Sequence, residues 1–356
     1  MANVTYYIGA GASAGKRAEN GAILEGLPCV NEITHRIDNL ISRISKAKLY
    51  EGDRDWRMPH FQLYTVGDWE SAKQRLIANL SQLRDACWRN ATIDTYAKKL
   101  VLQERKIELE HLERLLTFYF VVEQVLGIPD SRYDTFLANV LENLQQFPDN
   151  IKVISWNYDS QFEIAFYEYE KKNRLKIGSK LSSENQPYDI LKLNGSATFQ
   201  GPDYLPAYIL QRKEDMKKIG HKNLYGDADV KMENILPDLV LLYHLYVGEA
   251  TLEREHKTNL SFAFDYNQLS DVMLHRANQI IEKTDVLVII GYTFPFFNRE
   301  TDRKVLDFLD PDTEIYIQDR NPERVKQSFL AVCPNVKEHK IHLVRDVDQF
   351  FLPPQL

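Results

Sequence analysis

One stretch of the chain, Asp285–Ile290 (DVLVII), constrains the fold more than any other. It is continuously apolar after its first residue and ends directly at Gly291. A strand exposed on one face alternates apolar and polar side chains, whereas an unbroken apolar run is typical of a strand buried on both faces. Such strands occur in parallel sheets that helices cover on both sides. The run therefore predicts the centre of a parallel α/β sheet.

Shorter strand-like runs and helical segments alternate along the rest of the chain. The runs are Val4–Ile8, Ile151–Ser155, Tyr188–Leu193, Glu314–Ile317 and Lys340–Val344, and the helical segments are 30–44 (capped near Asn31), 160–172, 236–247, 268–283, 299–308 and 322–331. Residues 200–235 have little periodicity and predict loops. Alternating strands and helices favour right-handed crossovers and parallel pairing. We predict an α/β fold with a Rossmann-like parallel sheet, flanking helices and an all-helical insertion or subdomain.

The middle of the chain is almost free of Gly and Pro. From Asp68 to Gln146 only Gly127-Ile128-Pro129 interrupts the pattern, so we expect three or four helices there. A stripe with helical spacing, suited to core packing or to a subunit interface, consists of Leu109, Leu112, Leu116 and Tyr119. The mixed charges of 103–114 predict a solvated helix face. We assign residues 1–67 and 148–356 to a Rossmann-type nucleotide-binding domain and residues 68–147 to a helical insertion.

Composition excludes several classes of protein. The 44 Lys and Arg residues against 51 Asp and Glu residues give a net charge of −7, which argues against direct nucleic-acid binding because phosphates need a basic face. The three cysteines, Cys29, Cys87 and Cys333, are too far apart for a zinc ribbon. The first residues lack a secretory signal, and no apolar run approaches the roughly 18 residues of a membrane span. We therefore expect a cytoplasmic protein without membrane contact.

A glycine-rich segment, Gly9–Lys16, follows the first predicted strand. It does not fit a P-loop, because Ala10 occupies the position of the first glycine and Arg17 that of the magnesium-binding Ser or Thr. The spacing Gly9-x-Gly11-x-x-Ala14 fits the dinucleotide fingerprint better. The glycines of that fingerprint permit a tight turn and a close approach to a pyrophosphate. A purely structural turn is the alternative.

The same segment contains Gly11–Gly15, which matches the G-x-S-x-G pattern of serine hydrolases. Its position on the first strand, without an oxyanion motif upstream, disfavours that chemistry. A metal site is also disfavoured, because the nine histidines include no HExxH spacing and no accompanying Cys or Asp cluster. We therefore expect no metal.

Small and polar residues follow five of the predicted strands. They lie in Gly9–Gly15, Ser155–Asp159, Lys192–Ser196, Gly291–Phe294 and Gln318–Pro322. Ligands of open parallel sheets bind beyond the carboxyl ends of the strands. The sequence therefore predicts a nucleotide site where these five segments meet.

The order of these motifs resembles that of the sirtuin-like family (the silent-information-regulator superfamily), especially its bacterial antiphage NAD-hydrolase branch. The matching pieces are Gly9–Ser13, Gly26-Leu27-Pro28, Asn157–Asp159, Lys192–Ser196 and Gly291–Phe294. The resemblance covers both ends of the chain and treats the helical middle as an insertion. It implies an NAD-binding domain of Rossmann type.

The resemblance also implies roles for individual residues. It makes Asn157, Asp159 and Asn194 the catalytic set, with Asn157 matching the residue that the family requires for breaking the nicotinamide–ribose bond. Ser13 joins Asn157 and Asp159 in the nicotinamide pocket. The implied NAD-contacting residues are Gly9, Ala10, Gly11, Ala12 and Ser13 at the pyrophosphate, Gly291, Tyr292 and Thr293 at phosphate and ribose, and Asp319 and Asn321 at the adenosine ribose.

One position departs from the family pattern, because Asn194 stands where the family has its catalytic His in Lys-Leu-His-Gly. An imidazole can take a proton from a ribose hydroxyl near neutral pH, whereas an amide can only hydrogen-bond. Protein deacylation is therefore disfavoured, unless His221 or His256 supplies a base. Hydrolysis of NAD to nicotinamide and ADP-ribose is affected less, since Asp159 could stabilise an oxocarbenium-like state and Asn157 could position a water.

Two hypotheses about function follow. The first is an NAD hydrolase, which the resemblance implies to be an antiphage-defence effector, assembled as a homo-oligomer or switched on by a protein activator. The second is a module of the same fold that binds NAD or ADP-ribose and reports occupancy without cleaving it. Asn194 is the residue that favours the second hypothesis.

Overall fold

A computed structural model describes most of the chain. The described residues are 1–48, 66–142, 147–169, 190–199, 258–264 and 268–356, together with Met232, Ile235, Leu236, Leu239, Val240, Leu242, Tyr243 and Val247. The loop-rich prediction for 200–235 and the histidines His221 and His256 therefore fall almost wholly outside the described residues. Of the helix expected at 236–247, residues 236, 239, 240, 242 and 243 are described and are helical.

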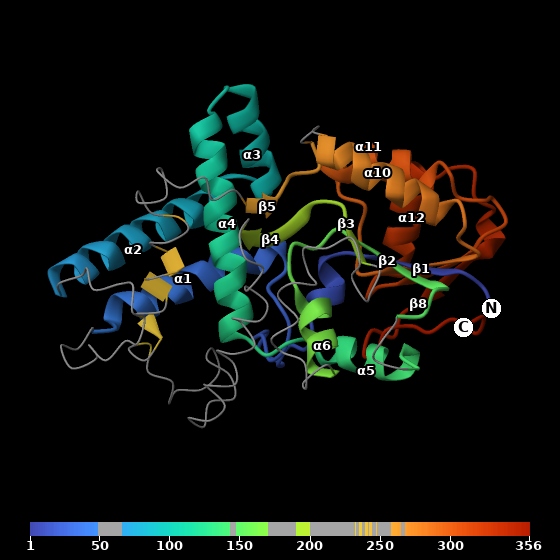
Figure 1. Ribbon diagram of the computed structural model, residues 1–356, viewed down its shortest axis with the longest axis horizontal. Helices are drawn as coiled ribbons and strands as arrows, with labels where there is room; N and C mark the ends of the chain where they lie inside the picture. Colours follow the sequence, from blue (N-terminus) through green and yellow to red (C-terminus); the bar gives the residue numbers. More distant parts are fainter. Residues whose placement is uncertain are drawn as a thin grey trace.

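Six parallel strands form the central sheet (Figure 1). They are β1 (Val4–Ile8), β2 (Ile151–Ser155), β3 (Ile190–Lys192), β6 (Val286–Ile290), β7 (Glu314–Gln318) and β8 (Ile341–Val344), in the order β3-β2-β1-β6-β7-β8. The chain builds outward from β1 to one edge, returns to the middle, and then builds from β6 to the other edge. This is the strand order of Rossmann-like folds, and the boundary between β1 and β6 is its switch point. The predicted fold class is confirmed.

The register of the central strands sets three turns side by side. Ile8 at the end of β1 lies opposite Ser155 of β2 and Ile290 of β6. Because the strands are parallel, the residues after these three positions leave the sheet at the same edge. All five residues of β6 are buried, as the continuous apolar run predicts.

Helices cover both faces of the sheet (Figure 1). One face carries α10 (Gln268–Ile281), α11 (Arg299–Leu306) and α12 (Pro322–Val332). The other carries α5 (Ser131–Val140), α6 (Gln161–Tyr169) and Phe350 near the C-terminus. Alternate side chains of β1 enter the two cores, with Tyr7 in the first and Tyr6 in the second.

Four helices pack together beyond the carboxyl edge of the sheet, where Figure 1 shows them on the side opposite the N-terminus. They are α1 (Val30–Lys46), α2 (Val66–Arg89), α3 (Ile93–Leu102) and α4 (Lys106–Leu126). Helices α2–α5 correspond to the predicted helical middle of the chain, and α1 from the N-terminal segment joins α2–α4 in this cluster. Helix α1 packs against α2, whereas α5 packs against α6 on the sheet. The domain boundaries at 67/68 and 147/148 stay a prediction.

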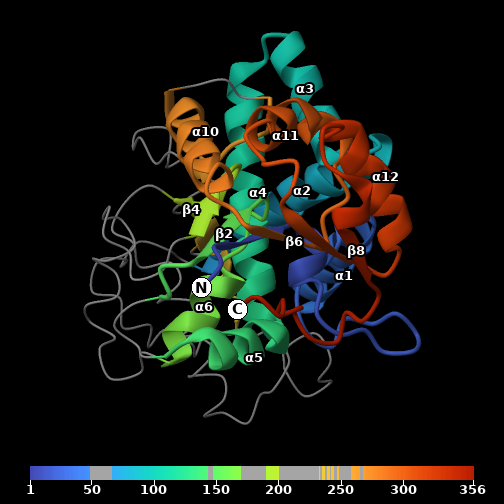
Figure 2. The same ribbon diagram turned by 90° about the vertical axis from the view of Figure 1, so that its right-hand side faces the viewer.

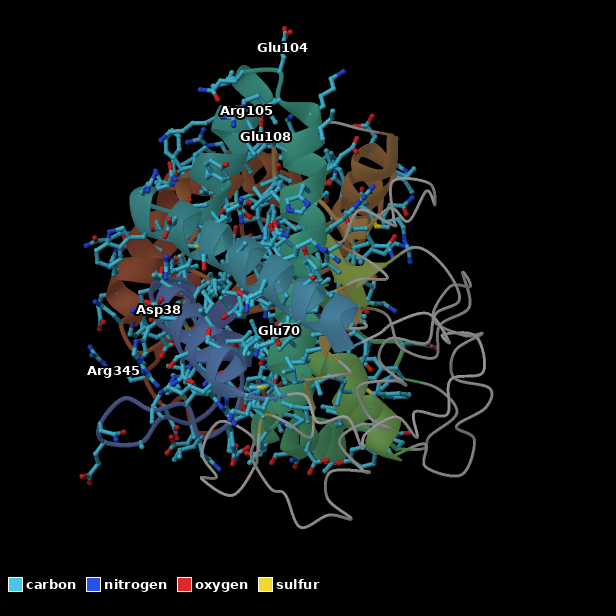
Figure 3. The ribbon with its side chains drawn as sticks, turned by 90° about the vertical axis from the view of Figure 1, so that its left-hand side faces the viewer. Asp38, Glu70, Glu104, Arg105, Glu108 and Arg345 are labelled. Carbon is cyan, nitrogen blue, oxygen red and sulfur yellow. The ribbon has the colours of Figure 1, made fainter. Side chains whose placement is uncertain are left out.

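The leucine stripe packs within the chain. Leu112, Leu116 and Tyr119 are buried in the core of the four helices, and Leu109 packs against it. Of the mixed-charge stretch 103–114, residues 103–108 and Glu110 are exposed as predicted, whereas 109, 111, 113 and 114 are half-buried. Figure 3 shows Glu104 projecting from the turn between α3 and α4, beside Arg105 and Glu108. The stripe thus serves the core, and an oligomer stays a prediction.

Some elements differ from their predictions. Helix α1 begins at Val30, so Cys29 rather than Asn31 precedes its first turn; Glu32 Oε2 accepts from the Cys29 amide at 2.6 Å. Two short strands, β4 (Gly195–Phe199) and β5 (Thr258–Leu260), were not predicted and pair antiparallel against α4. Among the described residues, no helix combines the length and apolar character needed to cross a membrane.

Candidate functional site

The glycine turn after β1 lies directly against the turn after β6. The Gly11 amide donates to the Gly291 carbonyl oxygen at 2.9 Å, and the Gly9 amide donates to the Ile290 carbonyl oxygen at 3.1 Å. A Cβ atom added to Gly11 would lie 2.6 Å from the Gly291 Cα. Gly291 itself has φ +57°, which favours glycine. These glycines therefore allow two backbones to meet at the switch point.

This packing defines what a ligand could meet. Since the amides of Gly9, Gly11 and Ala12 already donate to carbonyl oxygens of the protein, the turn does not offer them freely to a pyrophosphate. Ala10 is exposed, whereas Ala12 and Ser13 are buried. Of the five predicted pyrophosphate residues, Ala10 and the half-buried Gly11 therefore form the outer surface of the turn.

Ser13 is a buried junction at the end of this turn, with 2% of its surface exposed. Its hydroxyl is 2.9 Å from the Tyr133 hydroxyl and accepts from Asn157 Nδ2 at 3.0 Å. Its carbonyl oxygen accepts from Gln161 Nε2 at 2.9 Å and from the Leu27 amide at 2.7 Å. The residue therefore links the glycine turn to α5, to the loop after β2 and to the Gly26-Leu27-Pro28 segment.

Gly26 explains why that last segment can approach so closely. It has φ +82°, and a Cβ atom there would lie 2.5 Å from the Ser13 and Ala14 carbonyl oxygens. A recess opens beside it, lined in part by Gln124 and Gln161. The Gly-x-Pro motif is thus part of the site's structure.

Asn157 and Asp159 lie in the loop between β2 and α6, and both are 7% exposed. Asn157 Nδ2 also donates to the Gly9 carbonyl oxygen at 2.9 Å, so this amide bridges the two ends of the glycine turn. Asp159 Oδ1 accepts from the Gln161 amide at 3.0 Å, at the first turn of α6. The structure thus brings the predicted trio Ser13, Asn157 and Asp159 together.

The charge of Asp159 depends on opposing influences. Burial raises the pKa of this carboxyl, and the Lys192 ammonium, the Gln161 amide and the Ser13 hydroxyl oppose the rise. Lys192 donates to the Asp159 carbonyl oxygen and pairs with Glu163 at 2.7 Å. A desolvated carboxylate beside one ammonium is a setting in which small changes of charge have large effects.

Asn194 lies in the turn between β3 and β4 and is 5% exposed. Its carbonyl oxygen accepts from the Ser261 amide at 3.0 Å. The next residue, Gly195, has φ +67°, a conformation that favours glycine. A Cβ atom on Gly195 would overlap the carbonyl oxygen of Asn259. The Asn194 Oδ1 atom, in contrast, is buried and accepts from no group in the part of the chain that the structure describes. An acceptor left unpaired in this way is costly in a folded protein, so this atom is a candidate to accept from a bound ligand or a water.

The remaining predicted residues lie farther along the same edge. Tyr292 turns its side chain into the core, where its hydroxyl donates to Asp302 Oδ2 at 2.8 Å, so a ligand could meet only its backbone. Thr293 is exposed. Asp319 Oδ1 accepts from the Asn321 amide at 2.8 Å, and Asn321 Oδ1 accepts from the Arg324 amide at 3.4 Å at the start of α12. The last two side chains therefore shape their own turn.

Sequence reasoning missed Arg132, which holds the glycine turn from below. Its guanidinium donates to the carbonyl oxygens of Gly11 at 2.9 Å, Ala12 at 3.2 Å and Val347 at 3.0 Å, and pairs with Asp130 at 2.6 Å. The only local signal is Asp130, an N-cap residue after the Gly-Ile-Pro break. Nothing in the sequence distinguishes Arg132 from an exposed arginine, because its carbonyl partners are distant along the chain.

The described residues include no cluster of three or more His, Cys, Asp or Glu side chains that could hold a metal ion. Beyond the carboxyl ends of the strands, the site contains two buried carboxyl groups (Asp159 and Glu163), the bridging Asn157 amide at the glycine turn, and the unpaired Asn194 Oδ1 after the edge strand β3. Such a group can orient a polar ligand and stabilise positive charge, and among the described residues that form it there is no imidazole.

A comparison of the chain with models of known protein families and with curated proteins found no match in either.

Proposed function

We propose that the chain binds NAD at the carboxyl edge of the sheet and hydrolyses it to nicotinamide and ADP-ribose. The observation that carries this proposal is the buried, hydrogen-bonded group of Ser13, Asn157 and Asp159 at the β1–β6 switch point. Dinucleotides bind Rossmann-like sheets at that point. The motif order described above supplies the identity of the nucleotide and of the bond that is broken.

The reaction needs stabilisation of positive charge more than it needs a base. Cleavage of the nicotinamide–ribose bond develops oxocarbenium character, which a nearby carboxylate stabilises most strongly in a water-poor site. Asp159 would supply that charge, with Lys192 favouring its ionised form. Asn157 would hold the reacting centre in position, and the unpaired Asn194 Oδ1 would accept from a ribose hydroxyl or a water.

The test is nicotinamide release from NAD by the purified chain, measured by chromatography, alone and with the products of neighbouring genes. Asn157→Ala should abolish most of the release. Asn139→Ala is the matched control, because Asn139 is exposed on α5 and bonds only within its own helix. No release by the unaltered chain under any of these conditions would overturn the proposal.

A second candidate function is a sensor that binds NAD or ADP-ribose without cleaving it. The observation that favours it is local: Asn157 Nδ2 and Asp159 Oδ1 both make hydrogen bonds that hold the turn and α6 in place. Stabilisation by NAD in a thermal-shift titration, with no turnover even after Asn194→His, would support this sensor. Turnover that appears on Asn194→His would instead identify a hydrolase weakened at one position.

The motif order extends the first candidate to antiphage defence, with activity controlled by assembly or by a protein activator. The four-helix cluster α1–α4 lies beyond the same edge of the sheet as the site, so a partner bound there could act on the site at short range. Release of nicotinamide that depends on oligomer size in light scattering, or on an added gene product, would test this extension.

A further inference from the structure

The buried side chain of Asp302, on the sheet face covered by α10–α12, connects the turns after β1, β2 and β6. Asp302 of α11 is 0% exposed. Its Oδ1 accepts from the Tyr7 hydroxyl at 2.5 Å and from Trp156 Nε1 at 3.1 Å, and its Oδ2 accepts from the Tyr292 hydroxyl at 2.8 Å. Each donor belongs to a different strand or strand end of the parallel sheet.

Each of the three donors lies at or close to a predicted site residue. Tyr7 lies two residues before Gly9, Trp156 directly precedes Asn157, and Tyr292 directly follows Gly291. The backbones of these neighbours face the site, whereas the donor side chains turn to the opposite side, into the core with α10–α12. Asp302 thus contacts the β1, β2 and β6 turns from beneath.

Aromatic packing makes the group stiff. The Trp156 and Tyr292 rings stack with centroids 5.8 Å apart, and the Tyr7 ring meets Tyr292 edge-on at 5.4 Å. Trp156 Nε1 also donates to the Tyr7 hydroxyl at 2.9 Å. Phe294, which has φ +54°, closes the cluster against Tyr292 at 4.8 Å. A hydrogen bond lost here cannot be replaced by water without disturbing these rings.

We infer that Asp302 is a positioning residue that sets the relative placement of the β1, β2 and β6 turns at the ligand site. A carboxyl group suits this task, because its two oxygens can bond three polar groups that converge from separate strands. An apolar residue would fill the space but would leave three buried donors unpaired, which a core tolerates poorly. The effect on catalysis rests on the proposed NAD site, whereas the effect on the turns does not.

The experiment is amide hydrogen exchange on the full chain, followed peptide by peptide, for Asp302→Ala, Asp302→Asn and Tyr292→Phe. Asp302→Ala should raise exchange about tenfold in the peptides covering 9–13, 157–160 and 291–294, with α2 and α4 unchanged. Asp302→Asn should recover much of this protection, because its amide oxygen still accepts from Tyr7 and Trp156. Glu300→Ala is the control, on the exposed side of the same helix.

Tyr292→Phe keeps the ring and removes one hydroxyl, so it answers the question even if Asp302→Ala fails to fold. Faster exchange confined to 291–294 is the expected result. Exchange that is unchanged in all three turns, or that rises equally in α2 and α4, would overturn the inference.

Turnover separates the two proposals. If the unaltered chain cleaves NAD, Asp302→Ala should lower kcat by on the order of 10²-fold with little change in KM, and Asp302→Asn should restore most of it. If the unaltered chain releases no nicotinamide, the proposed function fails, and the exchange pattern alone decides the role of Asp302.

Discussion

The Gly11 amide donates to the Gly291 carbonyl oxygen at 2.9 Å, which joins the turn after the first strand to a turn 280 residues later in the chain. Neither position has room for a side chain: a Cβ on Gly11 would lie 2.6 Å from the Gly291 Cα, and a Cβ on Gly291 would lie 2.5 Å from the Gly11 Cα. The switch point of the sheet is therefore closed by backbone against backbone, and the site is built on that contact.

The first prediction concerns that contact. Gly291→Ala should destabilise the fold by more than the about 1–2 kcal/mol that a left-handed conformation costs an L-residue, because its Cβ also collides with backbone. Gly21→Ala is the matched control, since Gly21 has φ +82° and nothing lies within 4 Å of its added Cβ. Chemical denaturation of both variants gives the comparison, and equal losses would show that the turns separate without cost.

The second prediction concerns Asn157 and Asp159. Asn157→Ala should lower the rate of NAD cleavage by on the order of 10²–10³-fold, with a much smaller change in NAD affinity. Asp159→Asn should do the same if its charge serves the reaction. If Asp159 serves only to bond the Gln161 backbone amide, Asp159→Asn should leave both turnover and melting temperature nearly unchanged, because an Asn Oδ1 accepts the same bond. Measuring both quantities for both variants separates these outcomes.

The pH dependence of the reaction provides a third test on the same carboxyl. Burial raises the pKa of Asp159, so the ionised form is lost at a higher pH than for an exposed Asp. Turnover should therefore fall on acidification before ordinary carboxylates titrate. Lys192→Met should move this acid limb to still higher pH, because the ammonium that favours the ionised form is gone. If Lys192→Met leaves the acid limb of the pH–turnover profile unchanged, Asp159 is not the group whose ionisation controls turnover.

The fourth prediction uses Asp302 and stability. Burial raises the pKa of Asp302 from 3.8 to about 7, so between these values the folded protein holds a proton that the unfolded chain has released. The free energy of unfolding should therefore fall as pH rises through this interval, by up to about 1.4 kcal/mol per pH unit from this group. Denaturation at pH 5 and pH 7 should show the slope in the unaltered chain and a smaller slope in Asp302→Asn. Asp312→Asn, at an exposed surface ion pair, should leave the slope as it is.

The fifth prediction concerns the clamp at Arg132. Arg132→Lys keeps the charge but cannot reach three carbonyl oxygens and Asp130 at once, so stability should fall by about 1–3 kcal/mol for each buried carbonyl oxygen left unpaired. The control is Arg345→Lys at the exposed ion pair with Glu323, where Figure 3 shows Arg345 at the surface and where the expected change is about 1 kcal/mol or less. Similar losses in both variants would contradict the clamp.

The elements that sequence reasoning predicted best are those whose burial is complete. Continuous apolar runs such as β6 leave little choice, since no other arrangement hides both faces of a strand. The convergence of Asn157 with the glycine turn also followed from the strands alone, because parallel strands share a carboxyl edge. Asp159 Oδ1 accepts from the Gln161 backbone amide at the first turn of α6, a bond that Asp residues commonly make where a helix begins.

Other features depend on contacts between distant segments and leave no local trace. Strands β4 and β5 are short, and their residues Gly195 and Asn259 are types that are common in turns. The two strands pack against α4, and the sequence does not reveal that contact. Helix periodicity showed which face of α1 is buried, but not that α2 rather than the sheet would cover it. Arg132 and Asp302 act through residues more than a hundred positions away, so their importance appears only in three dimensions.

The placement of β1 between β2 and β6 has a consequence for synthesis of the chain. Val4 pairs with Ile151 on one side and with Val286 on the other, so the second neighbour arrives about 280 residues after the first strand is made. At roughly 5–20 residues per second, that interval lasts between about 15 s and 1 min. During it, β1 has an open edge that invites pairing with other chains, and the Gly11–Gly291 contact cannot form. The switch point of the sheet therefore stays open until about four fifths of the chain has been translated.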